Sequence, residues 1–114
     1  MSRTDDDARD DRMFQIAEDL RITKTTRRAS GAGTWVCGTT MGHRFSALVF
    51  PEHAEIPDYE LEDSRISKLW IQRLADRQEV CNFDRGWDIR PTTELAEAIV
   101  DFLAAGLAEH TYAE

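Results

Sequence analysis

The chain of 114 residues has little of several features on which particular classes of protein depend. No apolar run approaches the ~20 residues that cross a bilayer, so the sequence predicts no membrane-spanning segment. The acidic N-terminus has no apolar stretch typical of a secretory signal, so we expect a cytoplasmic location. The two cysteines, Cys37 and Cys81, fall in strand-like segments and lack the close Cys or His spacing of a zinc site. We therefore expect reduced, buried thiols and no cofactor or metal.

Basic charge is also in short supply, and only one long block of the chain carries it without acidic residues. The formal net charge is −8 and the sequence pI is about 4.8. Residues 21–50 carry five basic side chains and no acidic one. An acidic chain is repelled by nucleic acid and by anionic membranes, so the composition disfavours both as partners. The alternative is a nucleic-acid accessory protein that binds through the basic residues 21–50, with nearby aromatic side chains stacking on bases.

The N-terminal segment is dominated by acids. Residues 1–11 have almost no apolar side chain, and we expect them to form a flexible acidic arm ahead of a single α+β domain over residues 12–114. Apolar residues from Met13 to Leu20 follow helical spacing, which predicts a short helix. The β-branched residues that follow leave open a strand that begins near Ile16.

The middle of the chain alternates between strand-like and turn-forming segments. The C-terminal part reads as a helix, because Pro91 stops the last strand, Thr92 or Thr93 can cap the helix, and Gly106 lies on its apolar arc. Together these patterns predict an α+β fold, with an antiparallel meander sheet of four to five strands and a C-terminal amphipathic helix packed on one face. The clearest predicted strands are residues 34–39, 43–50, 65–74 and 78–83.

Large apolar residues fall on both faces of the predicted strand 65–74. Simple alternation places Ile66, Trp70 and Leu74 on one face and Leu69 and Ile71 on the other. A sheet open to water on one side alternates more cleanly, so we expect both faces to be covered. The second cover would be the N-terminal helix, a curl of the sheet, or a second subunit. This pattern favours a homodimer or another protein partner.

The densest polar and aromatic stretch is NFDRGWDIRP, residues 82–91. We interpret it as the turn from the last strand to the helix. Gly86 supplies a positive φ, Trp87 covers the end of the core, and Asp84, Arg85 and Asp88 pin the connection. A carboxylate pair beside a guanidinium could also act in acid–base chemistry.

Two candidate sites follow from these segments. Trp and Arg are frequent anchors of protein interfaces, so the favoured hypothesis is a non-enzymatic interaction domain. Its predicted surface consists of Arg65, Lys68, Trp70, Arg85 and Trp87. The alternative is a small enzyme or ligand binder, with a pocket formed by Trp35, His43, Asp84 and Asp88. A metal site from His53, Glu55 and Asp58 is a weaker possibility. No catalytic residue is assigned.

The segments SRISKLWI (64–71) and FDRGWD (83–88) resemble a family of small uncharacterised prokaryotic proteins, a domain of unknown function. The similar stretches extend over GHRFSALVFPEHA (42–54) and into the C-terminal helix, and so over much of residues 34–109. The resemblance implies a stand-alone intracellular domain from a prokaryote. It implies no activity, ligand or catalytic residue.

Overall fold

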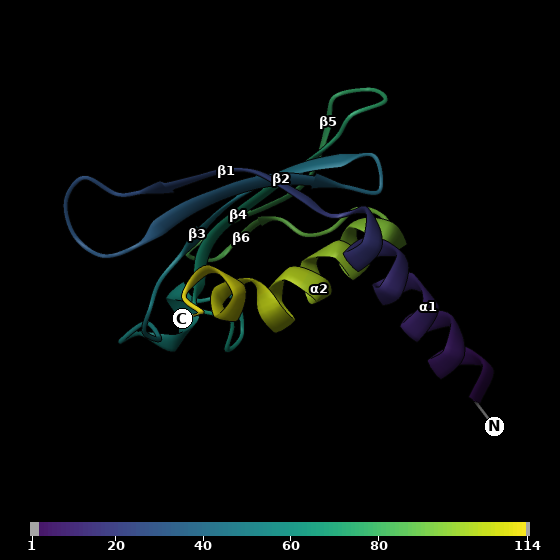
Figure 1. Ribbon diagram of the computed structural model, residues 1–114, viewed down its shortest axis with the longest axis horizontal. Coiled ribbons are helices and arrows are strands. Elements are labelled where there is room, and N and C mark those ends of the chain that lie inside the picture. Colours follow the sequence, from purple (N-terminus) through teal and green to yellow (C-terminus); the bar gives the residue numbers. More distant parts are fainter. Residues whose placement is uncertain (1–2, 114) are drawn as a thin grey trace.

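The computed structural model describes residues 3–113, with side chains from residue 11 onward, and forms one sheet with two long helices (Figure 1). The elements are α1 (Arg3–Asp19), β1 (Arg21–Arg27), β2 (Thr34–Thr40), β3 (His43–Val49), the 3-10 turn η1 (Pro57–Tyr59), β4 (Ile66–Arg73), β5 (Gln78–Asp84), β6 (Trp87–Ile89) and α2 (Glu94–Thr111).

The sheet is an antiparallel meander in which every strand pairs with its neighbours in sequence, in the order β1-β2-β3-β4-β5-β6. The predicted α+β class is confirmed, but the predicted strand number of four to five is wrong, because the described residues form six strands. The missed strand is β6, which lies inside NFDRGWDIRP. Asp84, Arg85 and Gly86 turn the chain back so that Trp87 pairs with Phe83. Three residues are too few to show an alternating pattern in the sequence.

In the N-terminal part of the chain, the sequence allowed either a short helix from Met13 to Leu20 or a strand that begins near Ile16, and the structure shows the helix. The helix α1 runs to Asp19, and the strand β1 begins at Arg21, after the predicted helix and not near Ile16. Residues 1 and 2 lie outside the described residues, while residues 3–11 have helical backbone as the start of α1. The flexible arm over residues 1–11 therefore stays a prediction.

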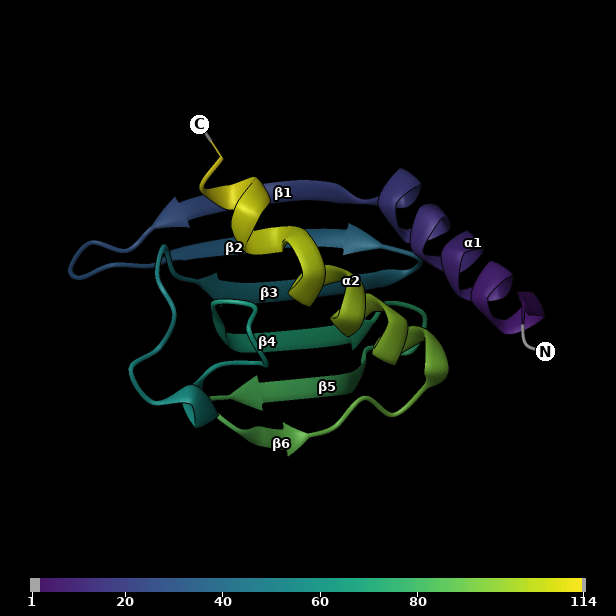
Figure 2. The same ribbon diagram turned by 90° about the horizontal axis from the view of Figure 1, so that it is seen from below.

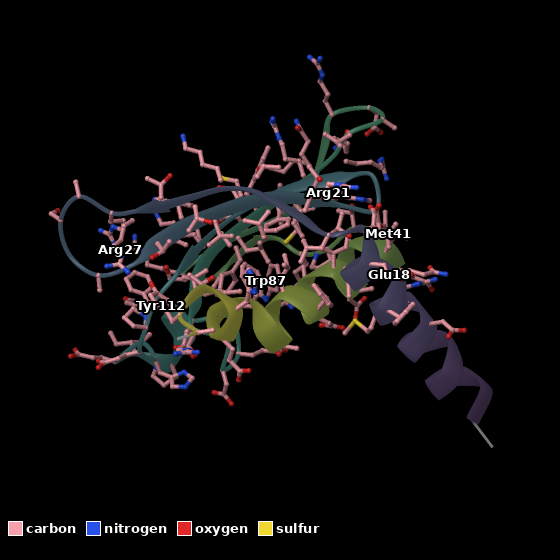
Figure 3. The ribbon with its side chains drawn as sticks, in the orientation of Figure 1. Glu18, Arg21, Arg27, Met41, Trp87 and Tyr112 are labelled. Carbon is pink, nitrogen blue, oxygen red and sulfur yellow. The ribbon has the colours of Figure 1, made fainter. Side chains whose placement is uncertain are left out.

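The helix α2 crosses one face of the sheet diagonally and supplies much of the core (Figure 2). Thr93 is its N-cap, since the Thr93 hydroxyl accepts a hydrogen bond from the Ala96 N–H at 3.0 Å. At the other end, the Tyr112 hydroxyl donates to the Val49 carbonyl at 2.8 Å and holds the helix against the sheet (Figure 3). Between these anchors, Ile99 and Leu103 are fully buried with core residues of the strands.

A β-bulge changes which residues of β4 reach the core. The pairing of β3 with β4 shifts register between Leu48 and Val49. The extra residue turns Ile66 to the same side as Leu69 and Ile71, and all three are buried. The strict alternation predicted from the sequence, with Ile66 opposite to Leu69, is therefore wrong.

Both helices lie on the same side of the sheet, and no described element covers the other side (Figure 1). The expectation that both faces are covered is thus not met within the described chain. The open face carries polar and aromatic side chains. Trp35 and Trp70 are half-buried there, and the Arg44 guanidinium lies 5.5 Å from the centre of the Trp70 ring.

The two thiols are free and lie in different environments. Cys81 is in the core, where burial, followed by the charge of Glu79, raises its pKa to about 12. Cys37 is only half-buried, and its sulfur lies 3.5 Å from the Ser46 hydroxyl. The prediction of a buried thiol therefore holds for Cys81 and not for Cys37.

Gly106 does not provide the close approach that its predicted position suggests. It is exposed in α2, and a Cβ added there would meet nothing within 4 Å. Because glycine costs about 0.5–1 kcal/mol relative to alanine inside a helix, we expect Gly106→Ala to raise the free energy of unfolding by that amount. Urea denaturation followed by circular dichroism measures the change.

The matched control is Gly38→Ala in β2. A Cβ at Gly38 would lie 2.6 Å from the Arg21 carbonyl oxygen and 2.8 Å from the Phe45 ring, so the strands must shift. We expect this substitution to lower the free energy of unfolding by about 1–3 kcal/mol, which is typical of overpacking. Equal effects of the two substitutions would contradict the packing described here.

Candidate binding groove

The connectivity of the meander brings three connections to one end of the sheet. In an antiparallel meander, alternate connections lie at the same end. The β1–β2, β3–β4 and β5–β6 connections therefore meet, and they enclose a groove of about 680 Å³. We call this the basic groove. It is lined by Arg28, Ala32, Leu48, Phe50, Pro51, Glu52, His53, Ala54, Tyr59, Glu60, Arg65, Ser67, Lys68 and Arg85.

Four long cationic side chains line the groove, namely Arg28, Arg65, Lys68 and Arg85. Two of the guanidinium groups lie over aromatic rings. Arg28 is 5.8 Å from the centre of the Phe50 ring, and Arg85 is 5.9 Å from that of Tyr59. Such cation–π contacts hold planar guanidinium groups in place while leaving their N–H donors free for a ligand.

The acids near these cations neutralise them only in part. Asp84 lies 3.7 Å from both the Lys68 ammonium and the Arg85 guanidinium. These side chains are 40–60% exposed, and ion pairs of this kind contribute little. A ligand carboxylate or phosphate could therefore compete for the same cations.

A buried carboxylate organises the wall of the groove. Glu60 is 7% exposed and accepts three hydrogen bonds. The backbone N–H of Ala54 and that of Arg65 donate at 2.7 Å and 3.1 Å, and the His53 ring donates from Nδ1 at 2.7 Å. Burial alone would raise the pKa of Glu60, but these hydrogen bonds outweigh it and hold the pKa below the usual 4.5.

Two arginines of the groove have backbone φ angles in the left-handed region. Arg65 and Arg85 have φ angles of 63° and 54°. The Arg65 side chain donates a hydrogen bond to the Pro51 carbonyl at 2.8 Å, and the backbone N–H of Arg85 donates one to the Ser67 carbonyl at 2.9 Å. Arg77, in a turn outside the groove, has the same conformation, so the positive φ by itself does not mark a site. It does make Arg77 a matched control for Arg85.

The predicted interaction surface is divided between three places. Arg65, Lys68 and Arg85 come together in the basic groove. Trp70 lies on the open face of the sheet. Trp87 lies on the helix side, half-buried, with its ring at 5.2 Å from that of Phe83 in an edge-to-face contact (Figure 3).

The four residues of the predicted pocket do not converge. Trp35 and Asp84 line one shallow depression on the open face, together with Trp70. His43 is 4% exposed on the helix side, with Nδ1 at 2.8 Å from the Met41 carbonyl oxygen. Asp88 is exposed on β6.

Sequence reasoning missed several groove residues. Phe50 ends the predicted strand 43–50, and Tyr59 and Glu60 lie in the connection that follows it, and none of the three was assigned to a site. Arg28 was considered only as part of the basic residues 21–50. Combining the meander prediction with the rule that alternate connections share an end would have grouped these segments. His53 was a candidate metal ligand with Glu55 and Asp58, but its ring donates a hydrogen bond to the Glu60 carboxylate. The described residues contain no cluster of three metal-ligating side chains.

The comparisons with known proteins place the chain in a family. The model of the family Domain of unknown function (DUF7678) matches residues 34–108, more than half of the chain, so the protein belongs to this family. The match spans β2 to most of α2 and includes Arg65, Lys68 and Arg85, whereas Arg28 lies outside it. No curated protein and no solved structure matches the chain significantly. Neither α1 nor α2, as far as they are described, is long and apolar enough to span a membrane.

We expect Glu60→Ala to destabilise the protein by about 1–3 kcal/mol, because it leaves the partly buried backbone N–H groups of Ala54 and Arg65 without this acceptor. Thermal unfolding measures the loss. Glu52→Ala is the control, since Glu52 is an exposed carboxylate of the same connection and should change stability by no more than about 0.5 kcal/mol. Similar losses for both variants would contradict the role given to Glu60.

The lowered pKa of Glu60 predicts a pH dependence. A carboxyl group with a lower pKa in the folded state adds stability above its unfolded pKa, and this stability is lost as the pH falls through the folded pKa. The wild type should therefore lose stability more steeply than Glu60→Gln as the pH falls below 4.5. Parallel stability curves in denaturant titrations over this range would refute the prediction.

Proposed function

We propose that the protein is a non-catalytic interaction domain that binds carboxylate groups of a protein partner in the basic groove. The observation that carries the proposal is the gathering of four cationic side chains in one groove of a chain with net charge −8. Loops held by a rigid sheet are common binding sites. Guanidinium groups that are already held in place lose little further freedom on binding a carboxylate.

The apolar part of the groove favours a peptide over a free ion. Leu48, Phe50 and Tyr59 line the same groove as the cations. A chain segment with acidic and apolar side chains would use both features. The volume of about 680 Å³ suits a few side chains of such a segment.

The other two hypotheses receive less support. The small-enzyme hypothesis needs Trp35, His43, Asp84 and Asp88 in one cleft, and they lie on different sides of the sheet. The nucleic-acid hypothesis needs a continuous basic surface from residues 21–50. Pairing instead puts Lys24 opposite Cys37 on the open face and Arg27 opposite Thr34 on the helix side (Figure 3), while Arg28 lies in the groove.

We further propose that the protein acts in the cytoplasm of a prokaryote and that it self-associates. The two free thiols support a reducing compartment. The resemblance of residues 64–71 and 83–88 to a family of small prokaryotic proteins supports a prokaryotic origin. The half-buried Trp70 on an open sheet face supports a further contact surface.

A labelled peptide rich in glutamate and leucine tests the groove. We expect it to bind the wild type more weakly as salt rises, and we expect Arg85→Glu to weaken binding about tenfold or more, because a charge-assisted hydrogen bond is lost and a repulsion is gained. Fluorescence anisotropy measures both effects.

Arg77→Glu is the matched control, because Arg77 is an exposed turn arginine with φ 58°, close to the 54° of Arg85. It should leave peptide binding unchanged. Equal losses for the two variants would show a nonspecific charge effect, and no binding at any salt concentration would refute the proposed function.

A further inference from the structure

A second charged surface lies beside the basic groove and has the opposite sign. An open hollow of about 800 Å³ is formed by the segment 57–63, the β5–β6 turn and the start of α2. A second hollow lies beside it, and Glu62, Asp63 and Asp101 line both hollows. We call the carboxylates of these hollows, other than the buried Glu60, the acidic surface. It consists of Asp58, Glu62, Asp63, Glu97 and Asp101.

These carboxylates are not neutralised within the described part of the chain. None of the five takes part in an ion pair there. Arg90 lines the same hollow, but its guanidinium lies over the Trp87 ring at 5.6 Å. Among the described side chains, the acidic surface therefore keeps its carboxylates without an ion-pair partner.

The basic groove and the acidic surface are separated by a single segment. Tyr59 and Arg65 line the groove, whereas Asp58, Glu62 and Asp63 line the acidic hollow, and Glu60 borders both. The β5–β6 turn divides them in the same way, with Arg85 on the basic side and Gly86 on the acidic side. Opposite charges thus lie next to each other, and no ion pair among the described residues joins the basic groove to the acidic surface.

Exposed apolar groups lie on the same dividing segment. Ile56 and Tyr59 are 50% and 45% exposed, although both are large apolar side chains. Protein interfaces typically combine such anchors at the centre with charged groups at the rim. The segment 56–65 therefore has the composition of an interface core flanked by two complementary rims.

We propose that the partner in the basic groove is a second copy of this chain, which inserts its acidic surface while its own groove receives the acidic surface of the first. This inference rests on the proposed function of the groove. Because the two surfaces adjoin, one two-fold axis through the segment 56–65 can form both contacts, and closed two-fold dimers are the commonest assemblies. At physiological salt the Debye length is about 8 Å, so local complementarity outweighs the repulsion of two chains of net charge −8.

Two charge-reversed variants test the reciprocal contact. Arg28→Glu with Arg85→Glu reverses the groove, and Glu62→Lys with Asp63→Lys reverses the acidic surface. All four residues are exposed, so each variant should fold, which circular dichroism checks. Arg21→Glu with Arg77→Glu is the control, because both arginines are exposed and lie outside the groove and the acidic surface.

Sedimentation equilibrium of the full chain is the measurement. We expect the wild type and the control to dimerise, more weakly at high salt, and each charge-reversed variant alone to associate about tenfold more weakly or not at all. An equal mixture of the two variants should dimerise again, because both contacts of the mixed pair then join opposite charges.

Three results would overturn the inference. They are a wild type that is monomeric at physiological salt and high concentration, reversed variants that dimerise like the wild type, and a mixture that fails to regain dimers. If the acidic peptide still binds in an Arg85-dependent way, the proposed function stands and only the identity of the partner is wrong. If neither peptide binding nor dimerisation is seen, both proposals fail.

Discussion

The buried carboxylate of Glu60 is the interaction on which the functional end of the molecule depends. A carboxylate removed from water is costly unless hydrogen bonds replace its hydration, and Glu60 receives them from Ala54, His53 and Arg65. These bonds tie both ends of a long β3–β4 connection to one point. The position of Arg65 in the groove, and the display of Asp58 and Glu62 on the far side, follow from this single anchor.

Charge arrangement matters more here than net charge. A chain with pI about 4.8 suggests an acidic surface throughout, yet four cations line one groove and five carboxylates gather beside it. The strand Arg21–Arg27 shows the opposite outcome, since its pairing with β2 sends Lys24 and Arg27 to different faces. A run of like charges in a sequence therefore becomes a surface only when the local structure keeps the side chains on one side.

The sequence allowed the α+β class, the meander and the Thr93 cap region to be predicted, because each depends on local patterns of turns and apolar spacing. It did not reveal the strand Trp87–Ile89, which is too short for a periodic signal. The side taken by Ile66 depends on a bulge that only the pairing with β3 creates. Arg65, Lys68 and Arg85 line one groove, whereas Trp70 and Trp87, named with them from the sequence, lie elsewhere, and placing them needed the strand faces to be known. Glu60 could not be found, since its role comes from contacts with His53, Ala54 and Arg65 across a folded loop.

The meander also sets the order in which the chain can fold. Each strand pairs with the strand made just before it, so the sheet grows mostly by closing short loops, apart from the long β3–β4 connection. Closing short loops costs little chain entropy and favours rapid folding. The helix α2 is the exception, because it packs against β2, β3 and β4 from the far end of the sequence. During synthesis the six strands can assemble while their apolar face still lacks α2. The apolar face of the sheet therefore stays exposed until α2 has been made, and the docking of α2 then covers it.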